Sequence, residues 1–101
     1  MNVKGYEKLD DVLARAYNQA SQGKGAERHA NELPFHEQPM QQVANQVGRG
    51  FLLGQAIKKI VEAQGLPADR AVAEMLGAIN YIAGAVIHLE GQQIKAIEEN
   101  S

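Results

Sequence analysis

The chain has 101 residues, 45% of them hydrophobic, and its 10 Lys and Arg residues oppose 12 Asp and Glu residues for a formal net charge of −2. It contains no cysteine, which excludes a disulfide framework, a thiolate zinc site and a cysteine nucleophile. The nearly balanced charge argues against binding to long nucleic acids or to a membrane surface, and the length fits one small domain over residues 1–101.

The first predicted element is an amphipathic helix over residues 7–22. Its apolar residues recur at steps of three and four, which places them on one helical face: Leu9, Leu13, Ala16, Tyr17 and Ala20. Gly23 and Gly25 are expected to end this helix. Charged side chains between Lys4 and Asp11 interrupt any apolar run near the start, so we expect no signal peptide and a cytoplasmic location.

Residues 23–38 are predicted to form a long loop, because they combine two glycines and Pro34 with a dense mixture of charged and ring-bearing side chains. Loops of this length inside a small domain are usually functional or disordered. Phe35 and His36 lie on this loop. The ring of Phe35 is expected either to stack on a nucleobase or to pin the loop onto the core.

The start of this loop is the strongest candidate binding site. Gly23 and Gly25 allow successive backbone N–H groups to converge on an anion, while Lys24 and Arg28 add charged donors. We expect these residues, together with His29, to bind phosphate or carboxylate. The GxxxxGK[ST] spacing of a P-loop is absent, and the alternative interpretation is a solvated helix end followed by an ordinary turn.

A second helix is predicted over residues 39–64. Pro39 suits its first turn, and Pro67 starts the next helix directly after a glycine stop, so the two helices should form an antiparallel hairpin. This helix carries Arg49 and Lys58, which are candidates to close an anion site from a neighbouring subunit. The alternative is a solvated basic face.

The third predicted helix covers residues 68–98. Apolar residues at alternating steps of three and four form a packing seam along it: Val72, Met75, Ile79, Ile82, Val86 and Leu89. Small and apolar residues also cover a second face, and so small a chain has too few partners for both faces, which predicts homo-oligomerisation. A transmembrane helix is the alternative, disfavoured by Glu74, Asn80 and His88 inside the apolar stretch.

Glycines recur inside the predicted helices. Gly77, Gly84 and Gly91 are spaced by seven residues and form one stripe, and Gly50 and Gly54 are four residues apart on the preceding helix. Each helical glycine costs about 1 kcal/mol relative to alanine. Close backbone approach between helices compensates for that cost, so we expect another helix or a second subunit at these stripes, with direct ligand contact as the alternative.

Catalytic chemistry is poorly supported by the sequence. His29, Glu32 and His36 have suitable spacing for metal ligands, but Pro34 breaks any helix that would align them. The paired acidic motifs with which helical nucleotide hydrolases hold magnesium do not occur in a suitable helical context, and hydroxyl nucleophiles are scarce. We therefore expect no catalytic residue, metal or cofactor, and a nucleotide hydrolase is the least favoured function.

The strings GKGAERHANELPFHEQP, GQAIKKIVEA and LGAINYIAGAVIHLE, over roughly residues 22–90, resemble a family of small uncharacterised tailed-phage proteins. Separately, one short helix followed by a long helical hairpin is similar in layout to the phage anti-CBASS sponge proteins. Those are helical oligomers that sequester cyclic oligonucleotide immune signals between subunits. The similarity implies a sequestering role in the host cytoplasm, and no binding residue is carried over because only the layout matches.

These patterns predict an all-α protein with a short N-terminal helix, a long loop and an antiparallel helical hairpin, oligomerising through the C-terminal helix. The leading hypothesis is a non-enzymatic oligomer that sequesters a phosphate-bearing ligand, such as a nucleotide or a cyclic oligonucleotide. The alternative is a structural or protein-binding oligomer without a small ligand. The candidate ligand-binding residues are Gly23, Lys24, Gly25, Arg28, His29, Phe35, His36, Arg49 and Lys58.

Overall fold

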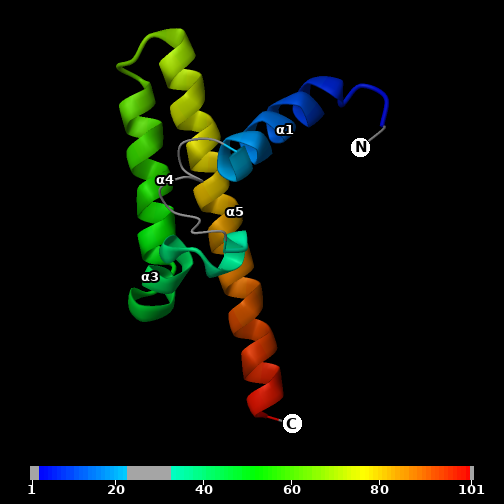
Figure 1. Ribbon diagram of the computed structural model, residues 1–101, viewed down its shortest axis with the longest axis vertical. Helices are drawn as coiled ribbons and strands as arrows, with labels where there is room; N and C mark the ends of the chain where they lie inside the picture. Colours follow the sequence, from blue (N-terminus) through cyan, green and yellow to red (C-terminus); the bar gives the residue numbers. More distant parts are fainter. Residues whose placement is uncertain (1–2, 23–32, 101) are drawn as a thin grey trace.

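The structure, a computed structural model, describes residues 3–22 and 33–100. Across these ranges the protein is all-α and has no strand. The predicted all-α class is therefore confirmed for the described part of the chain. The elements in chain order are α1 (Glu7–Gln22), the 3-10 helix η1 (Phe35–Glu37), α3 (Pro39–Val47), α4 (Gly50–Ala63) and α5 (Ala68–Glu99) (Figure 1).

Helices α4 and α5 lie side by side and run in opposite directions (Figure 1). The turn between them closes with backbone hydrogen bonds, in which the N–H of Gly65 donates to Glu62 at 3.2 Å and that of Leu66 to Ala63 at 3.3 Å. Pro67 then precedes the first residue of α5, and its carbonyl accepts the N–H of Ala71 at 2.8 Å. The sequence Gly-Leu-Pro thus reverses the chain within a few residues.

The expectation of one continuous helix over residues 39–64 is wrong at its middle. Gly48 has a φ of +100°, a left-handed conformation that glycine adopts without strain, and its N–H closes the last turn of α3 by donating to Ala44 at 2.7 Å. The chain changes direction there, and α4 begins afresh at Gly50. Because of this break, α3 folds back against α5 instead of extending α4.

The core lies where α3, α4 and α5 meet. Leu52 is fully buried and packs with Ala44 and Ala85, and partly buried Met40 and Tyr81 close this cluster. Apart from Leu52, the buried hydrophobic residues of the described chain are alanines. The protomer therefore has close backbone packing but buries few large apolar side chains.

Side-chain amides fasten α1 to α5 across their crossing point. The Nε2 of Gln19 donates to the carbonyl of Ala73 at 2.9 Å, and the Nδ2 of Asn80 donates to the carbonyl of Ala16 at 2.9 Å. Ala16 is buried at this contact because its small side chain allows the helices to approach. The N-terminal half of α1 extends away from the other helices (Figure 1).

The glycine stripe on α5 is used by the chain itself at two of its three positions. A Cβ on Gly84 would lie 3.0 Å from Nε2 of Gln41, and one on Gly77 would lie 3.0 Å from Cδ of Lys59. A Cβ on Gly91 would meet no atom of the described residues within 4 Å. The predicted close approach is thus intramolecular at Gly77 and Gly84.

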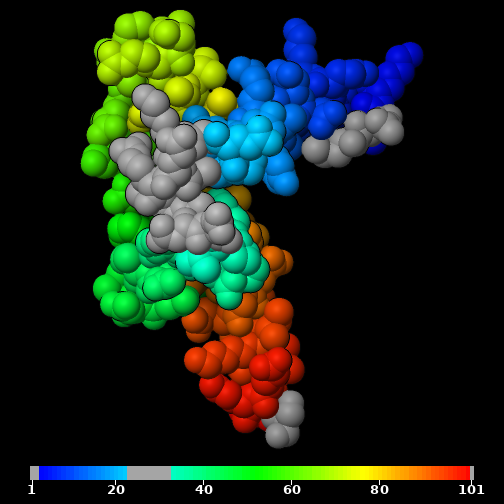
Figure 2. All heavy atoms as spheres, viewed as in Figure 1, coloured from blue at the N-terminus to red at the C-terminus, as the bar shows by residue number. Residues whose placement is uncertain are grey.

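The last part of α5 projects beyond the other elements. Every residue from Glu90 to Asn100 is exposed, and Figure 2 shows this segment as a narrow extension of the molecule. The remainder of α5 is packed against α1, α3 and α4.

Candidate functional site

The main concave surface is a groove of about 560 Å³ between α1 and the hairpin, here called the interhelical groove. It forms because α1 crosses one face of α5 while η1 and α3 return against the same face. Aromatic rings from three elements line it, namely Phe35 of η1, Phe51 of α4 and Tyr81 of α5. A volume of this size accommodates a small ligand, and ring-lined walls suit a planar group.

An ion pair lies on the wall of the interhelical groove. Nζ of Lys59 is 3.4 Å from Oε2 of Glu74 and 5.9 Å from the centroid of the Tyr81 ring. Gly77 has no side chain, which leaves room for the aliphatic part of Lys59. A Cβ at this position would lie 3.0 Å from Cδ of Lys59. Since Glu74 neutralises Lys59, this wall contributes little net positive charge toward an anion.

Two side-chain amides that line the groove already donate hydrogen bonds within the protein. Gln19 and Asn80 both donate to helix backbone at the α1–α5 crossing. An amide retains its carbonyl oxygen as an acceptor, so these two side chains suit a ligand that donates hydrogen bonds. The described part of the groove therefore combines aromatic rings with amide oxygens that can accept hydrogen bonds.

The predicted site residues fall into separate places. Phe35 lines the interhelical groove, whereas His36 is exposed on η1 and is not among the residues that line it. Lys58 is also exposed and lies 3.9 Å from Glu62 on its own helix, so within the protomer it contributes to neither cavity. The predicted anion-binding residues Gly23, Lys24, Gly25, Arg28 and His29 lie outside the described residues.

Arg49 lies at a second cavity, about 510 Å³ in volume, which we call the junction cavity because it adjoins the break between α3 and α4. His88 of α5 also lines it and is only 8% exposed. Neither ring nitrogen of His88 has a hydrogen-bond partner among the described residues. A buried polar group without a partner costs on the order of 1–3 kcal/mol, so this imidazole requires an explanation.

The sequence does not identify Lys59, Gln19 or Tyr81 as groove residues. Asn80 is partly buried on α5, so its amide needs a hydrogen-bond partner across a helix interface. The partner is the backbone of α1 in the same chain. Lys59 is adjacent to the predicted Lys58, and a step of one residue rotates a side chain by about 100° around a helix.

Two further properties of the described residues concern metal binding and membrane spanning. They contain no group of three or more His, Cys, Asp or Glu side chains arranged to hold a metal ion. By length and composition alone, α5 is long and apolar enough to cross a membrane, a test that core helices of other proteins also pass.

Comparisons with protein-family models, with curated proteins and with solved structures returned no match to this chain.

Proposed function

We propose that the protein is a non-enzymatic helical binding protein that works as a homo-oligomer, with subunits joined through one face of the α4–α5 hairpin. The supporting observation is an apolar surface that α1 and η1 leave open. It comprises Leu53, Ile57 and Ile60 on α4 and Met75, Ile82 and Val86 on α5, all of them exposed. We call this surface the open apolar face.

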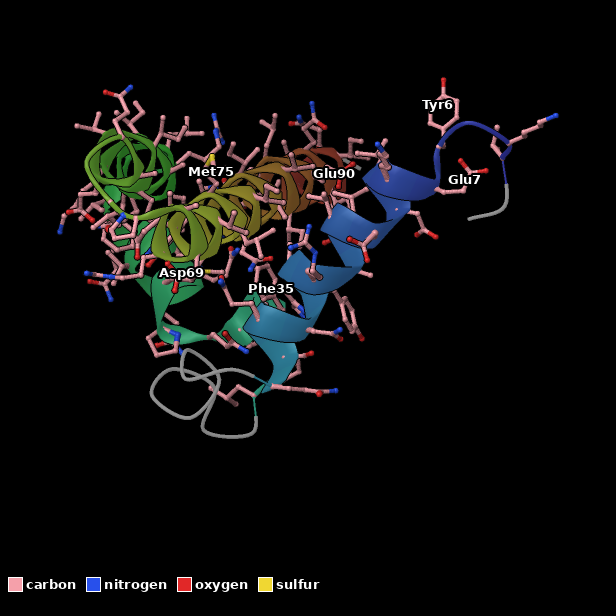
Figure 3. All side chains as sticks on the ribbon, turned by 90° about the horizontal axis from the view of Figure 1, so that it is seen from above. Tyr6, Glu7, Phe35, Asp69, Met75 and Glu90 are labelled. Atoms are coloured by element: carbon pink, nitrogen blue, oxygen red, sulfur yellow. The ribbon has the colours of Figure 1, made fainter. Side chains whose placement is uncertain are left out.

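Helix geometry places these residues together. Leu52 and Ala56 of α4 are buried, and Phe51 lines the interhelical groove. Leu53 and Ile57 therefore lie on the side of α4 that is turned away from the groove. Figure 3 shows Met75 on the side of the hairpin away from Phe35. Ile57 is 61% exposed and Met75 48%, values that are costly for large apolar side chains in water.

A second copy is the occupant we propose for the open apolar face. Two antiparallel hairpins packed face to face make a four-helix bundle, and the three-and-four spacing on α5 is the spacing such packing uses. A two-fold arrangement also covers the same patch on both subunits. The protomer buries one large apolar side chain completely among its described residues, Leu52, so the bundle would supply the larger core.

Light scattering coupled to size-exclusion chromatography tests this proposal on the full chain. We expect a dimer or higher oligomer that Ile82→Glu converts to monomer, because a charge buried between copies would lose its water. Tyr17→Glu, on the exposed surface of α1, is the matched control and should leave the oligomer intact. A monomeric parent protein contradicts the proposal, as does a protein recovered only with detergent or bound to phosphatidylglycerol vesicles.

We further propose that the ligand bears phosphate and is a nucleotide or cyclic oligonucleotide, sequestered unchanged in the host cytoplasm as the phage resemblance implies. The ring-lined groove supports the base-binding part of this proposal. The phosphate-binding part rests on the sequence. Lys24 and Arg28 lie in the chain between α1 and η1, and both of these elements contribute residues to the groove. Arg49 or Lys58 of a neighbouring copy would complete the site.

Thermal-shift titrations with nucleoside monophosphates and cyclic dinucleotides test the ligand, with nucleosides as phosphate-free controls. We expect stabilisation that Lys24→Ala combined with Arg28→Ala abolishes. The matched pair Lys8→Ala with Arg70→Ala should retain it, because both side chains are exposed on other surfaces. Chromatography of the released ligand should recover it intact. Cleaved ligand would indicate a hydrolase, and no response to any phosphate compound would leave the oligomer without a small ligand.

A further inference from the structure

The junction cavity is lined by hydrogen-bond donors and carries a positive charge. Asn45 and Arg49 border it from α3 and the start of α4, while His88, Gln92 and Gln93 border it from α5. No carboxylate is among the described residues that line it. In a chain with a formal net charge of −2, this combination is a local exception that favours an anion.

Arg49 occupies the N-cap position of α4, and no side chain among the described residues caps that helix end. The first N–H groups of a helix lack intrahelical acceptors and give this end a partial positive charge. The Arg49 carbonyl accepts the N–H of Leu53 at 3.1 Å, whereas no described residue forms an ion pair with its guanidinium. The Arg49 guanidinium thus offers its donors to the cavity beside this helix start, whereas the N–H of Phe51 already donates to the Gly48 carbonyl at 3.3 Å.

His88 supplies the second and independent indication. Its ring is more than nine-tenths buried in the wall of this cavity, and neither nitrogen meets a partner in the described chain. A neutral imidazole has one N–H donor, and a protonated one has two. Because both nitrogens are covered, an anion reaches the ring only after local side-chain rearrangement, and the neighbouring Gln92 and Gln93 have exposed side chains.

We infer that the junction cavity binds a small oxyanion, held by the guanidinium of Arg49 and by a nitrogen of His88, with the partial positive charge of the α4 N-terminus nearby. An arginine fork matches the oxygen geometry of phosphate and of carboxylate, and a helix N-terminus favours either anion. This site shares no lining residue with the interhelical groove, which reaches the start of α4 only through Phe51, so it does not depend on the proposed function.

Titration with inorganic phosphate, sulfate and acetate at constant ionic strength tests the inference. Long-range nitrogen–proton NMR spectra report the ring nitrogens of His88 directly, and calorimetry gives the affinity. We expect saturable shifts of the His88 ring with phosphate or sulfate if the site takes tetrahedral oxyanions, and with acetate if it takes carboxylates. Arg49→Gln should weaken binding by about tenfold or more, as loss of a charge-assisted bidentate contact does.

Two matched variants make the result specific. Arg70→Gln removes an exposed arginine elsewhere and should leave the affinity unchanged, and so should Arg15→Gln on the exposed surface of α1. Unperturbed His88 resonances at millimolar concentrations of every anion would overturn the inference. Equal affinity in the parent protein and in Arg49→Gln would overturn it as well, even if His88 variants fail to fold.

Discussion

Gln41 of α3 and Gly84 of α5 are joined by a buried hydrogen bond in which the Gln41 amide donates to the Gly84 carbonyl at 3.0 Å. Gln41 is only 3% exposed, so its amide has little room to move. The absence of a side chain on Gly84 permits this contact, because a Cβ there would lie 3.0 Å from the amide nitrogen and 3.3 Å from Cε of Met40.

Gly84→Ala should therefore destabilise the protein, although alanine is the better helix former. We expect a net loss of about 1 kcal/mol in the free energy of unfolding. Displacing the buried hydrogen bond costs more than the gain of about 1 kcal/mol in helix propensity. Gly91→Ala is the matched control on the same helix and should stabilise the protomer, since no described atom lies within 4 Å of its Cβ position. Urea unfolding curves measure both. Equal stabilisation by the two substitutions would show that the α3–α5 contact is loose.

Removing the Asn80 amide should loosen α1. Asn80→Ala deletes the donor to the Ala16 carbonyl and leaves Gln19 to fasten the crossing, so we expect a cost of about 1 kcal/mol confined to α1. Hydrogen exchange followed by mass spectrometry should show faster exchange in α1 and little change in α4. Asn18→Ala, exposed on α1, is the control. Unchanged exchange in α1 would mean that the hydrogen bond contributes nothing to docking.

Neutralising Glu74 should improve anion binding in the interhelical groove. Glu74→Gln releases Lys59 from its ion pair at 3.4 Å, and both side chains are 29% exposed, so their charges are only partly screened. We expect a gain of about threefold in the affinity for a cyclic dinucleotide, typical of one partly screened charge. Glu62→Gln, beside the more exposed Lys58, is the charge-matched control. An equal gain in both variants would indicate only a change in net charge.

The start of α1 should respond to acid through Glu7. The pKa of this carboxyl is lowered from 4.5 because the backbone N–H of Glu7 itself and that of Gly5 donate to it. A lowered pKa in the folded state gives stabilisation that is present above the unfolded value and is lost as the pH falls through the folded value. NMR spectra of the Gly5 amide should therefore change below about pH 4.5. Glu7→Gln should abolish that change, and a Gly5 signal that titrates in both proteins would assign it elsewhere.

The helical periodicity of the sequence is strong enough to locate most helical residues. Steps of three and four between apolar residues, with Pro67 before the second helix, predict helices over 7–22 and 68–98, and the structure has helices over 7–22 and 68–99. The break at Gly48 is not predicted, because a glycine inside an apolar pattern is equally typical of a packing position and of a helix end. Only its positive φ distinguishes the two.

The candidate sites are harder to predict because they depend on how the helices dock. Phe35 is expected at a site and lines the groove, but Lys59 and Gln19 join it only through the crossing of α1 over α5. His88 lies far along the chain from the binding residues expected from the sequence, the last of which is Lys58. Its burial beside Arg49 depends on the fold of α3 back onto α5, which no local pattern specifies.

The projecting end of α5, from Glu90 to Asn100, offers a test of the proposed assembly through its amide hydrogen exchange. A lone helical segment of this length is marginal in water, since helix formation has a costly nucleus and little packing supports these last turns. In a dissociated protomer this segment should fray and exchange its amide hydrogens quickly. Slow exchange there would therefore signal that another chain lies against it, whatever the geometry of the assembly.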